Sequence, residues 1–141
     1  MIPVIHIIRG ISGTGKSTLA LKYAESHNAT VIEADMWFEG TNGYKFDRNE
    51  IKNAHKWCML SVEKRLRVGK SAIVANTFCK LWELKHYVTL AKKYNCRWSV
   101  TKCVGNFKNV HNVPPKIIEL QKLNWEDCPD ESIYDGEKFT I

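Results

Sequence analysis

The segment 10–17 constrains the fold more than any other part of the chain. It reads GISGTGKS, matches the pattern GxxxxGK[ST], and lies between an apolar, β-branched run at 3–8 and an expected helix from Lys16 to His27. Glycines at these positions let the backbone curl, so that successive N–H groups point inward beside the positive end of the helix dipole. A strand that leads through such a loop into a helix indicates an α/β fold.

This loop has the chemistry of a phosphate-binding site. Its N–H groups would hold phosphate oxygens, Lys16 would bridge the β and γ phosphates, and the Ser17 hydroxyl would bind Mg²⁺. The residues expected to hold the nucleotide are Gly10, Ser12, Gly13, Thr14, Gly15, Lys16, Ser17 and Thr18. We therefore expect ATP and Mg²⁺ as ligands, while the motif leaves open whether the γ-phosphate goes to water, a small molecule or a macromolecule.

Strands alternate with helices along the rest of the chain. Further strands are expected at 30–33, 71–75 and 97–104, and further helices at 47–69, at 81–91 and from Pro114-Pro115 onward. The aromatic stretch 36–46, which contains two glycines, is predicted to be a loop. This alternation predicts a parallel sheet with right-handed crossovers.

Composition excludes several classes of protein. Hydrophobic residues at 44% and charged residues at 26% are typical of a globular chain of 141 residues with one core. No apolar run approaches the roughly 20 residues of a membrane helix, and the apolar start ends at Arg9-Gly10, too early for a secretory signal. Five scattered cysteines without metal-ligand spacing favour a reducing compartment. We expect a cytoplasmic protein without a membrane partner.

The charge is unevenly distributed along the chain. The net charge is +6, but 80–122 has nine basic and two acidic residues, whereas 123–141 has one basic and six acidic residues. A basic surface concentrates phosphates near it, so the middle of the chain suggests a polyanionic partner such as nucleic acid. A solvated basic face explains the charge equally well.

Asp35 follows the second expected strand. It would lie at the carboxyl edge of the sheet, where open α/β folds form their ligand crevice. Its carboxylate could accept the proton of an attacking hydroxyl as a general base. A capping or loop aspartate is the equal alternative on position alone.

An aromatic group surrounds the expected acceptor position after Asp35. Its members are Trp37, Phe38, Tyr44 and Phe46, with Lys45, Arg48 and Lys52 nearby. Aromatic rings can stack on nucleic-acid bases, at about 1 to 3 kcal/mol each, while lysine and arginine hold the backbone. Each ring taken singly favours a place in the core, but as a group they favour a wall of the substrate site.

Several segments together resemble the small P-loop kinases related to phage-type 5′-hydroxyl polynucleotide kinase. They are the phosphate loop, Ala34-Asp35, and the segments at 43–47, 54–58, 74–77, 82–87 and 111–114, within a match over about 4–125. The resemblance implies a four- to five-stranded parallel sheet flanked by helices, and transfer of the γ-phosphate of ATP to a hydroxyl. It also implies that Asp35 is the general base and that Asn76 helps to order Mg²⁺ and water.

The chain departs from this family in two places. Its third strand ends in Ala75-Asn76, without the usual carboxylate, so that metal binding would depend on Ser17, phosphate oxygens and water. The lid is shortened to 105–110, and Lys108 stands at the usual position of an arginine. Lysine supplies charge without the bidentate fork, so Lys108 is a candidate catalytic residue with weaker expected stabilisation of the transition state.

The sequence therefore predicts a P-loop kinase domain over 1–125 and an acidic C-terminal tail over 126–141. The leading hypothesis is an ATP-dependent phosphotransferase for a nucleic-acid 5′-hydroxyl. Kinases for a small molecule, a nucleoside or a modified DNA base would use the same loop and Asp35. A nucleotide-binding protein with weakened catalysis is the third alternative.

Overall fold

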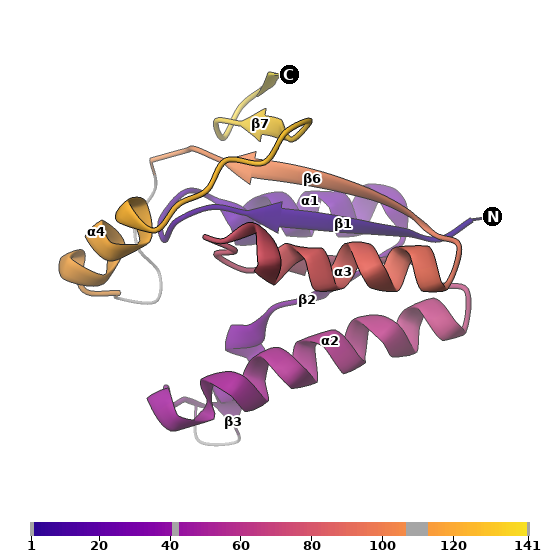
Figure 1. The fold of residues 1–141 in the computed structure, drawn as a ribbon, viewed down its shortest axis with the longest axis horizontal. Coiled ribbons are helices and arrows are strands. Elements are labelled where there is room, and N and C mark those ends of the chain that lie inside the picture. The colour runs from indigo at the N-terminus through magenta and orange to yellow at the C-terminus, as the bar shows by residue number, and fades with distance from the viewer. Residues whose placement is uncertain (1, 41–42, 107–112, 141) are drawn as a thin grey trace.

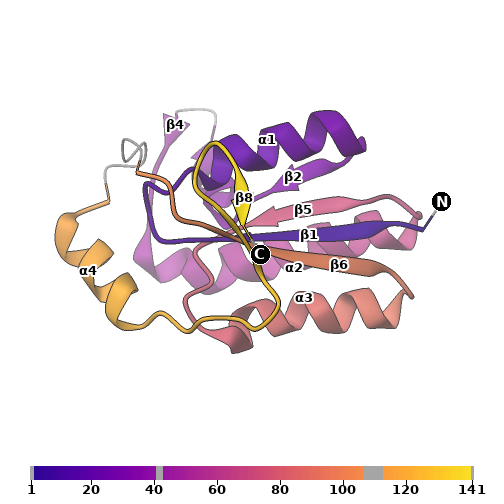
Figure 2. The same cartoon turned by 90° about the horizontal axis from the view of Figure 1, so that it is seen from above.

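A single sheet forms the framework of the computed structural model, which describes residues 2–40, 43–106 and 113–140. Within these ranges the sheet has six strands in the order β2-β5-β1-β6-β7-β8, and Figure 2 shows β2, β5, β1 and β6 side by side. The strands are β1 (Val4–Arg9), β2 (Thr30–Ile32), β5 (Ala72–Ala75), β6 (Arg97–Cys103), β7 (Ser132–Tyr134) and β8 (Phe139–Thr140). The first five are parallel and β8 is antiparallel to β7. This confirms the predicted α/β fold with a parallel sheet.

Helices cover both faces of this sheet. In the described part of the chain the α-helices are α1 (Lys16–His27), α2 (Ile51–Arg67), α3 (Leu81–Lys93) and α4 (Pro115–Leu123). Ile5 and Ile7 of β1 pack with α2 and α3, whereas Ile8 packs with α1. Both faces of β1 are therefore buried, as its continuous apolar run predicts. None of the helices in the described ranges has the length and apolar character needed to span a bilayer.

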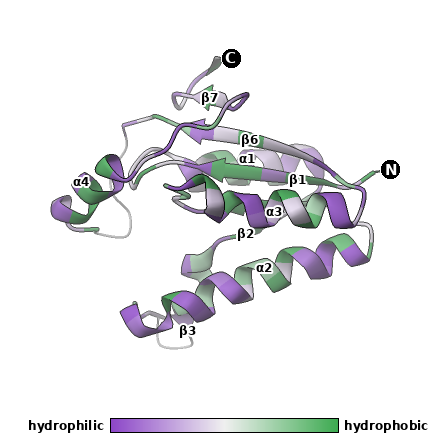
Figure 3. Cartoon of the chain, viewed as in Figure 1, coloured by the Kyte–Doolittle hydropathy of each residue, from purple (hydrophilic) through white to green (hydrophobic). Residues whose placement is uncertain are grey.

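Helix α2 shows how the sequence pattern sets a helix and its ends. Hydrophobic and hydrophilic residues alternate along it (Figure 3), and its buried positions recur every four residues, at Ala54, Cys58, Val62 and Leu66. The Asp47 side chain accepts a hydrogen bond from the Asn49 N–H (2.9 Å) and begins a short 3₁₀ turn ahead of α2. Gly69 follows its C-terminus with φ 74°, a conformation that glycine adopts without strain.

The stretch 34–46 is more ordered than the loop that the sequence predicts. It forms a 3₁₀ turn (Ala34–Phe38) followed by a hairpin of β3 (Glu39–Gly40) and β4 (Gly43–Tyr44). Phe38 anchors this segment, because its buried ring packs with Ala34 and with Ala54 of α2. Its carbonyl also accepts a hydrogen bond from the Lys45 N–H at 2.9 Å. Burial of one aromatic ring thus orders a segment in which the local sequence indicates only a turn.

The C-terminal segment joins the sheet. Strand β7 pairs in parallel with β6, from Thr101 opposite Ser132 to Cys103 opposite Tyr134. Tyr134 is buried against α1 and β1. The three residues of β7 are too few to show the alternating pattern that predicts a strand. Their strand conformation depends instead on hydrogen bonding to the edge of β6.

Candidate functional site

A cavity of about 470 Å³ lies at the carboxyl edge of the parallel strands. In Figure 1 this is the edge toward which β1 and β6 point, and α4 lies beyond it. The cavity is lined by Ser12, Gly13, Gly15, Lys16, Ser17, Thr18, Glu33, Ala34, Asp35, His55, Ala75, Asn76, Thr77, Phe78, Glu83 and Val113. It therefore brings together most of the predicted phosphate-loop residues with Asp35 and Asn76.

Two residues of the predicted phosphate loop support its shape from outside this lining. A Cβ atom on Gly10 would lie 2.9 Å from the Cys103 carbonyl oxygen, so only glycine allows β1 to enter the loop so close to β6. The Thr14 hydroxyl donates a hydrogen bond to the Ile11 carbonyl at 2.7 Å. These contacts hold the loop in its curled form before any phosphate binds.

Lys16 lies at the start of α1, with its ammonium group over the phosphate loop. Its Nζ donates a hydrogen bond to the Ile11 carbonyl at 3.1 Å. Burial lowers the pKa of Lys16, while the charges of Glu33 and Asp35 act in the opposite direction. A half-buried cation facing inward N–H groups is suited to hold the β and γ phosphates of a nucleotide.

Ser17 is hydrogen-bonded to a carboxylate that the sequence analysis did not select. Its hydroxyl donates to Glu33 Oε1 at 2.9 Å. Glu33 directly follows β2, which pairs with β5, the strand that is followed by Asn76 instead of a carboxylate. A hydroxyl and a carboxylate oxygen are ligand types that Mg²⁺ prefers, so this pair fits the ion. The position of Glu33 at a strand end, two residues before Asp35, was the available sequence signal.

The described residues contain no group of three or more histidine, cysteine or acidic side chains that could hold a metal by themselves. A magnesium ion here would be held by the Ser17 and Glu33 oxygens together with phosphate oxygens and water. In nucleotide sites Mg²⁺ is commonly bound by one or two protein oxygens, with phosphate oxygens and water as its other ligands.

Asp35 lies in the 3₁₀ turn after β2 and lines the cavity. The Tyr44 hydroxyl on β4 donates a hydrogen bond to Asp35 Oδ1 at 3.1 Å. Burial raises the pKa of Tyr44 to about 12, and the charge of Asp35 acts in the same direction. Tyr44 therefore stays protonated at neutral pH and orients the carboxylate. The cap position of the turn is Glu33 and not Asp35, so the carboxylate is placed toward the cavity by the hairpin.

Asn76 connects the end of β5 to the backbone beside Asp35. Its Oδ1 accepts a hydrogen bond from the Ala34 N–H at 2.8 Å, and its Nδ2 lies 3.6 Å from Cys58 Sγ. Both ends of this buried amide are thus engaged with protein groups. The contact to Ala34 fixes the residue that precedes Asp35.

The predicted aromatic wall separates into a buried and an exposed part. Phe38 is 8% exposed and packs against Tyr44 and Phe46, so its ring supports the hairpin from within the core. Trp37 and Tyr44 are each 41% exposed and Phe46 is 57% exposed. We call these three the hairpin aromatic surface. None of them is among the residues that line the cavity, and the Tyr44 hydroxyl is the group that connects this surface to Asp35, whereas the ring centroid of Trp37 lies 6.4 Å from that of Trp57 on α2.

Two further residues reach the cavity from the helices. His55 of α2 is exposed and lines it, although the sequence analysis gave no role to the segment around it beyond the family resemblance. Glu83 of α3 lines it too, and its Oε1 accepts a hydrogen bond from the Lys80 N–H at 3.2 Å. Neither is recognisable from spacing, because only the packing of the helices turns these positions toward the phosphate loop. Lys108, the candidate catalytic lysine, lies outside the described residues.

Comparisons with known proteins agree with this architecture. The family model described as an AAA domain matches residues 5–106, which include the phosphate loop, Asp35 and Asn76. NEDD4-binding protein 2 from Homo sapiens is 31% identical over 93 residues. The aligned part covers 64% of this chain and 5% of that protein, so the chain corresponds to a small part of the relative's length.

Solved structures share the fold at low sequence identity. A gluconokinase from Sinorhizobium meliloti 1021 has a TM-score of 0.60 at 14% identity, with 97% of this chain and 85% of that chain covered. The Pnkp1/Rnl/Hen1 RNA repair complex contains a chain with a TM-score of 0.61 at 18% identity, with 92% of this chain and 41% of that chain covered. The shared feature is a kinase-like P-loop fold.

Proposed function

Since this chain belongs to the family of AAA domains and has a kinase-like P-loop fold, we propose that it transfers the γ-phosphate of ATP to a nucleic-acid hydroxyl, most simply a 5′ end. The observation that carries the proposal is the convergence of Lys16, Ser17 and Asp35 on one cavity. A cation for phosphates, a hydroxyl for Mg²⁺ and a carboxylate for the acceptor proton are the groups that phosphoryl transfer needs.

The phosphate loop and Lys16 would bind and align the triphosphate of ATP. Ser17 and Glu33, whose side chains are hydrogen-bonded to each other, would hold Mg²⁺. When bound, the ion neutralises charge on the β and γ oxygens. Most of the catalysis would then come from positioning, because a loose transition state needs little covalent assistance.

Asp35 would receive the proton of the acceptor hydroxyl. As the new P–O bond forms, the bond between the γ-phosphorus and the bridging oxygen breaks, and ADP leaves with that electron pair. Tyr44 holds Asp35 Oδ1 by donating a hydrogen bond at 3.1 Å. The carboxylate is thereby kept in one orientation for the hydroxyl.

Three observations favour nucleic acid as the acceptor. The segment 80–122 is strongly basic, and the hairpin aromatic surface has three exposed rings, of which Tyr44 is hydrogen-bonded to Asp35. Exposed rings beside a phosphate-transfer site can stack on the bases of a single strand, at about 1 to 3 kcal/mol per base. The chain of similar fold in an RNA repair complex supports the same class of acceptor.

A transfer screen with radiolabelled ATP tests the acceptor. DNA and RNA oligonucleotides with a 5′-hydroxyl should become labelled, while the same oligonucleotides with a 5′-phosphate serve as the matched control. The logarithm of the association constant for the oligonucleotide should fall linearly with the logarithm of the salt concentration, with a slope of about −0.7 per neutralised phosphate. Labelling of gluconate or nucleosides instead, with no salt-dependent oligonucleotide binding, would identify a small-molecule kinase. ATP binding without transfer to any acceptor would identify a nucleotide-binding protein.

Glu33→Gln is expected to weaken the contribution of Mg²⁺ to ATP binding by about 10- to 100-fold, the usual effect of losing a carboxylate that orients a metal ligand. Binding of ATP without metal should change little, because Lys16 and the loop N–H groups remain. Calorimetry with and without Mg²⁺, and the electron paramagnetic resonance of Mn²⁺, measure the two quantities. Glu25→Gln on the exposed side of α1 is the control. Equal Mn²⁺ affinity in both variants would contradict a metal role for Glu33.

A further inference from the structure

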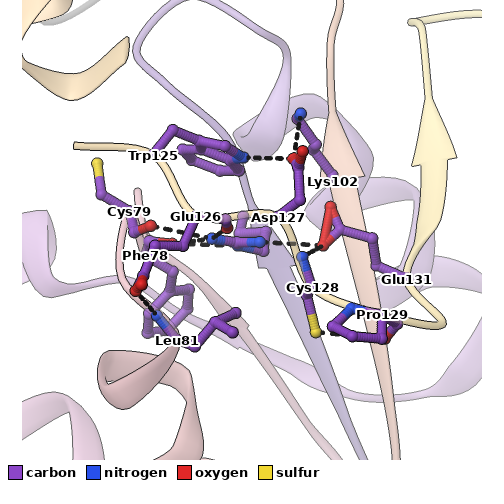
Figure 4. Close-up of polar contacts among 11 residues, drawn as sticks. Phe78, Cys79, Leu81, Lys102, Trp125, Glu126, Asp127, Cys128, Pro129 and Glu131 are labelled. Atoms are coloured by element: carbon purple, nitrogen blue, oxygen red, sulfur yellow. Dashed lines mark hydrogen bonds and ion pairs between the residues drawn. The ribbon is translucent and has the colours of Figure 1, made fainter. Parts of the chain in front are cut away.

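Arg9 is a fully buried cation directly before the phosphate loop. Figure 4 shows the residues that contact it, Phe78 and Cys79 after β5 and Trp125, Glu126 and Glu131 of the C-terminal segment, gathered in one place although they are far apart in sequence. It donates hydrogen bonds to the carbonyls of Phe78 (3.1 Å from Nε and 2.6 Å from Nη2), Cys79 (3.2 Å) and Glu126 (2.7 Å). Its Nη1 forms an ion pair with Glu131 at 2.9 Å. One side chain therefore joins β1, the segment after β5 and the C-terminal segment.

The C-terminal segment is what makes burial of Arg9 possible. A buried guanidinium is costly unless its charge is paired and its N–H groups are hydrogen-bonded. Glu131 supplies the charge from a side chain that is only 6% exposed. The ring of Trp125 covers the guanidinium, with Cζ 4.0 Å from the ring centroid. Residues 125–131 thus enclose a charge that sits at the entrance of the phosphate loop.

The main acceptor of Arg9 is a residue with an unusual backbone. Phe78 has φ 49° and is 2% exposed. Bulky residues rarely adopt this left-handed conformation, and they keep it at functional sites only where the surroundings impose it. Two donors of the Arg9 guanidinium converge on the carbonyl of Phe78 in this conformation. Phe78 also lines the cavity.

The two residues before Phe78 contact both halves of the proposed transfer site. The Thr77 carbonyl accepts a hydrogen bond from the N–H of Gly10, the first residue of the phosphate loop, at 3.2 Å. The side-chain oxygen of Asn76 accepts a hydrogen bond from the N–H of Ala34, the residue before Asp35, at 2.8 Å. A shift of 76–78 would therefore move the phosphate loop and the Asp35 turn relative to each other.

We propose that Arg9 is a positioning residue of the transfer site. By holding Phe78 in its left-handed conformation it fixes 76–78, and through Asn76 it fixes the distance between Asp35 and the phosphate loop. Residues 125–131 stabilise the buried guanidinium by covering it and pairing its charge, so loss of one of their contacts should loosen Phe78 less than loss of the Arg9 hydrogen bonds themselves. The consequence for transfer rests on the proposed function, whereas the consequence for the Ala34 backbone does not.

Arg9→Lys tests the proposal, because it keeps a charge opposite Glu131 but lacks the planar fork whose separate nitrogens reach the Phe78 carbonyl and Glu131 at the same time. We expect single-turnover transfer to fall by about 10- to 100-fold, the range caused by misplacement of a reacting group, with a smaller change in ATP affinity. Hydrogen exchange of the Ala34 amide, followed by NMR, should become faster by about 10-fold or more as its bond to Asn76 opens more often. Unchanged transfer and unchanged Ala34 exchange would overturn the proposal.

Glu131→Gln is the control that separates a positioning role of Arg9 from a general contribution of Arg9 to stability. It removes the paired charge and lowers the melting temperature, but its amide oxygen still accepts a bond from Arg9, whose hold on Phe78 remains. If it slowed transfer and loosened Ala34 as much as Arg9→Lys does, the effect would be one of general stability and the proposal would fail. Asp127→Asn, an 81% exposed partner of Lys102 in the same segment, controls for changes in surface charge.

Two further outcomes keep the proposal testable. Should Arg9→Lys fail to fold, Trp125→Leu removes only the covering ring, and Ala34 exchange must then rise by a smaller factor; no rise overturns the proposal. Should the wild-type chain label no acceptor, the proposed function fails, while Ala34 exchange in the same variants still decides the role of Arg9.

Discussion

Lys16→Ala is expected to weaken ATP binding by about 10²- to 10³-fold and to abolish transfer. The variant removes the charge-assisted hydrogen bonds proposed between Lys16 and the β and γ phosphates, and this fold-change corresponds to a net loss of about 2.7 to 4.1 kcal/mol, the size of one or two such bonds. The melting temperature should change little, because burial lowers the pKa of Lys16 and so disfavours its charged form in the folded chain. Isothermal titration calorimetry measures the affinity, and single-turnover assays measure the transfer.

Lys22→Ala is the matched control for this variant. It lies on the same helix, but its Nζ is hydrogen-bonded to the Tyr134 hydroxyl at 3.0 Å, away from the cavity lining. ATP affinity should be retained in Lys22→Ala. Equal affinities in folded Lys16→Ala and in the wild-type chain would overturn the assignment of the phosphate loop.

Asp35→Asn is expected to lower transfer by about 10²- to 10⁴-fold, the usual range for loss of a general base. ATP affinity should be nearly unchanged, since Asp35 is proposed to contact the acceptor hydroxyl and not the triphosphate. The fold should persist as well, because the asparagine oxygen can still accept the hydrogen bond from Tyr44. Part of the loss would come from a misplaced hydroxyl, because a loose transition state demands little base assistance early in the reaction.

The control for Asp35→Asn is Glu39→Gln, an exposed carboxylate that lies opposite Tyr44 in the hairpin. Both variants remove one negative charge near Tyr44, but only Asp35 lines the cavity. If the role of Asp35 were purely structural, Asp35→Asn would lower the melting temperature and leave transfer per folded molecule intact. That result, or equal transfer in both variants, would end its assignment as the base.

Elements with a strong local pattern were predicted closely. The helix expected from Lys16 to His27 has these bounds in the structure, β5 lies within the expected 71–75, and β1 covers Val4–Arg9 where 3–8 was expected. Helix α2 begins at Ile51, a few residues after the expected start, because Asp47 first caps a 3₁₀ turn. In each case residues a few positions apart carry the signal, so no distant contact is needed to read it.

Elements stabilised by distant contacts were predicted less well. The turn and hairpin over 34–46 depend on the burial of Phe38 against Ala54. The strand β7 depends on the edge of β6, and its three residues have no periodicity of their own. The local sequence does not distinguish a buried Phe38 from an exposed one, because aromatic side chains occur both in cores and in binding surfaces.

The sequence by itself determined that this chain has a phosphate loop between a buried strand and a helix. That information is local: glycines, a lysine and a serine at fixed spacing set the backbone and its chemistry wherever the rest of the chain goes. It also identified Asp35 at a strand end, since parallel strands bring their carboxyl ends to one edge.

Only the tertiary structure decided which other groups meet at that edge. Glu33 reaches Ser17 across 16 residues, Asn76 reaches Ala34 across 42, and Glu131 pairs with Arg9 across 122. Such contacts depend on strand order and on the burial of each group, which no window of sequence contains. Arg9 is costly to bury beside the phosphate loop, and its burial is stabilised by an ion pair with the carboxylate of Glu131, more than a hundred residues later in the chain.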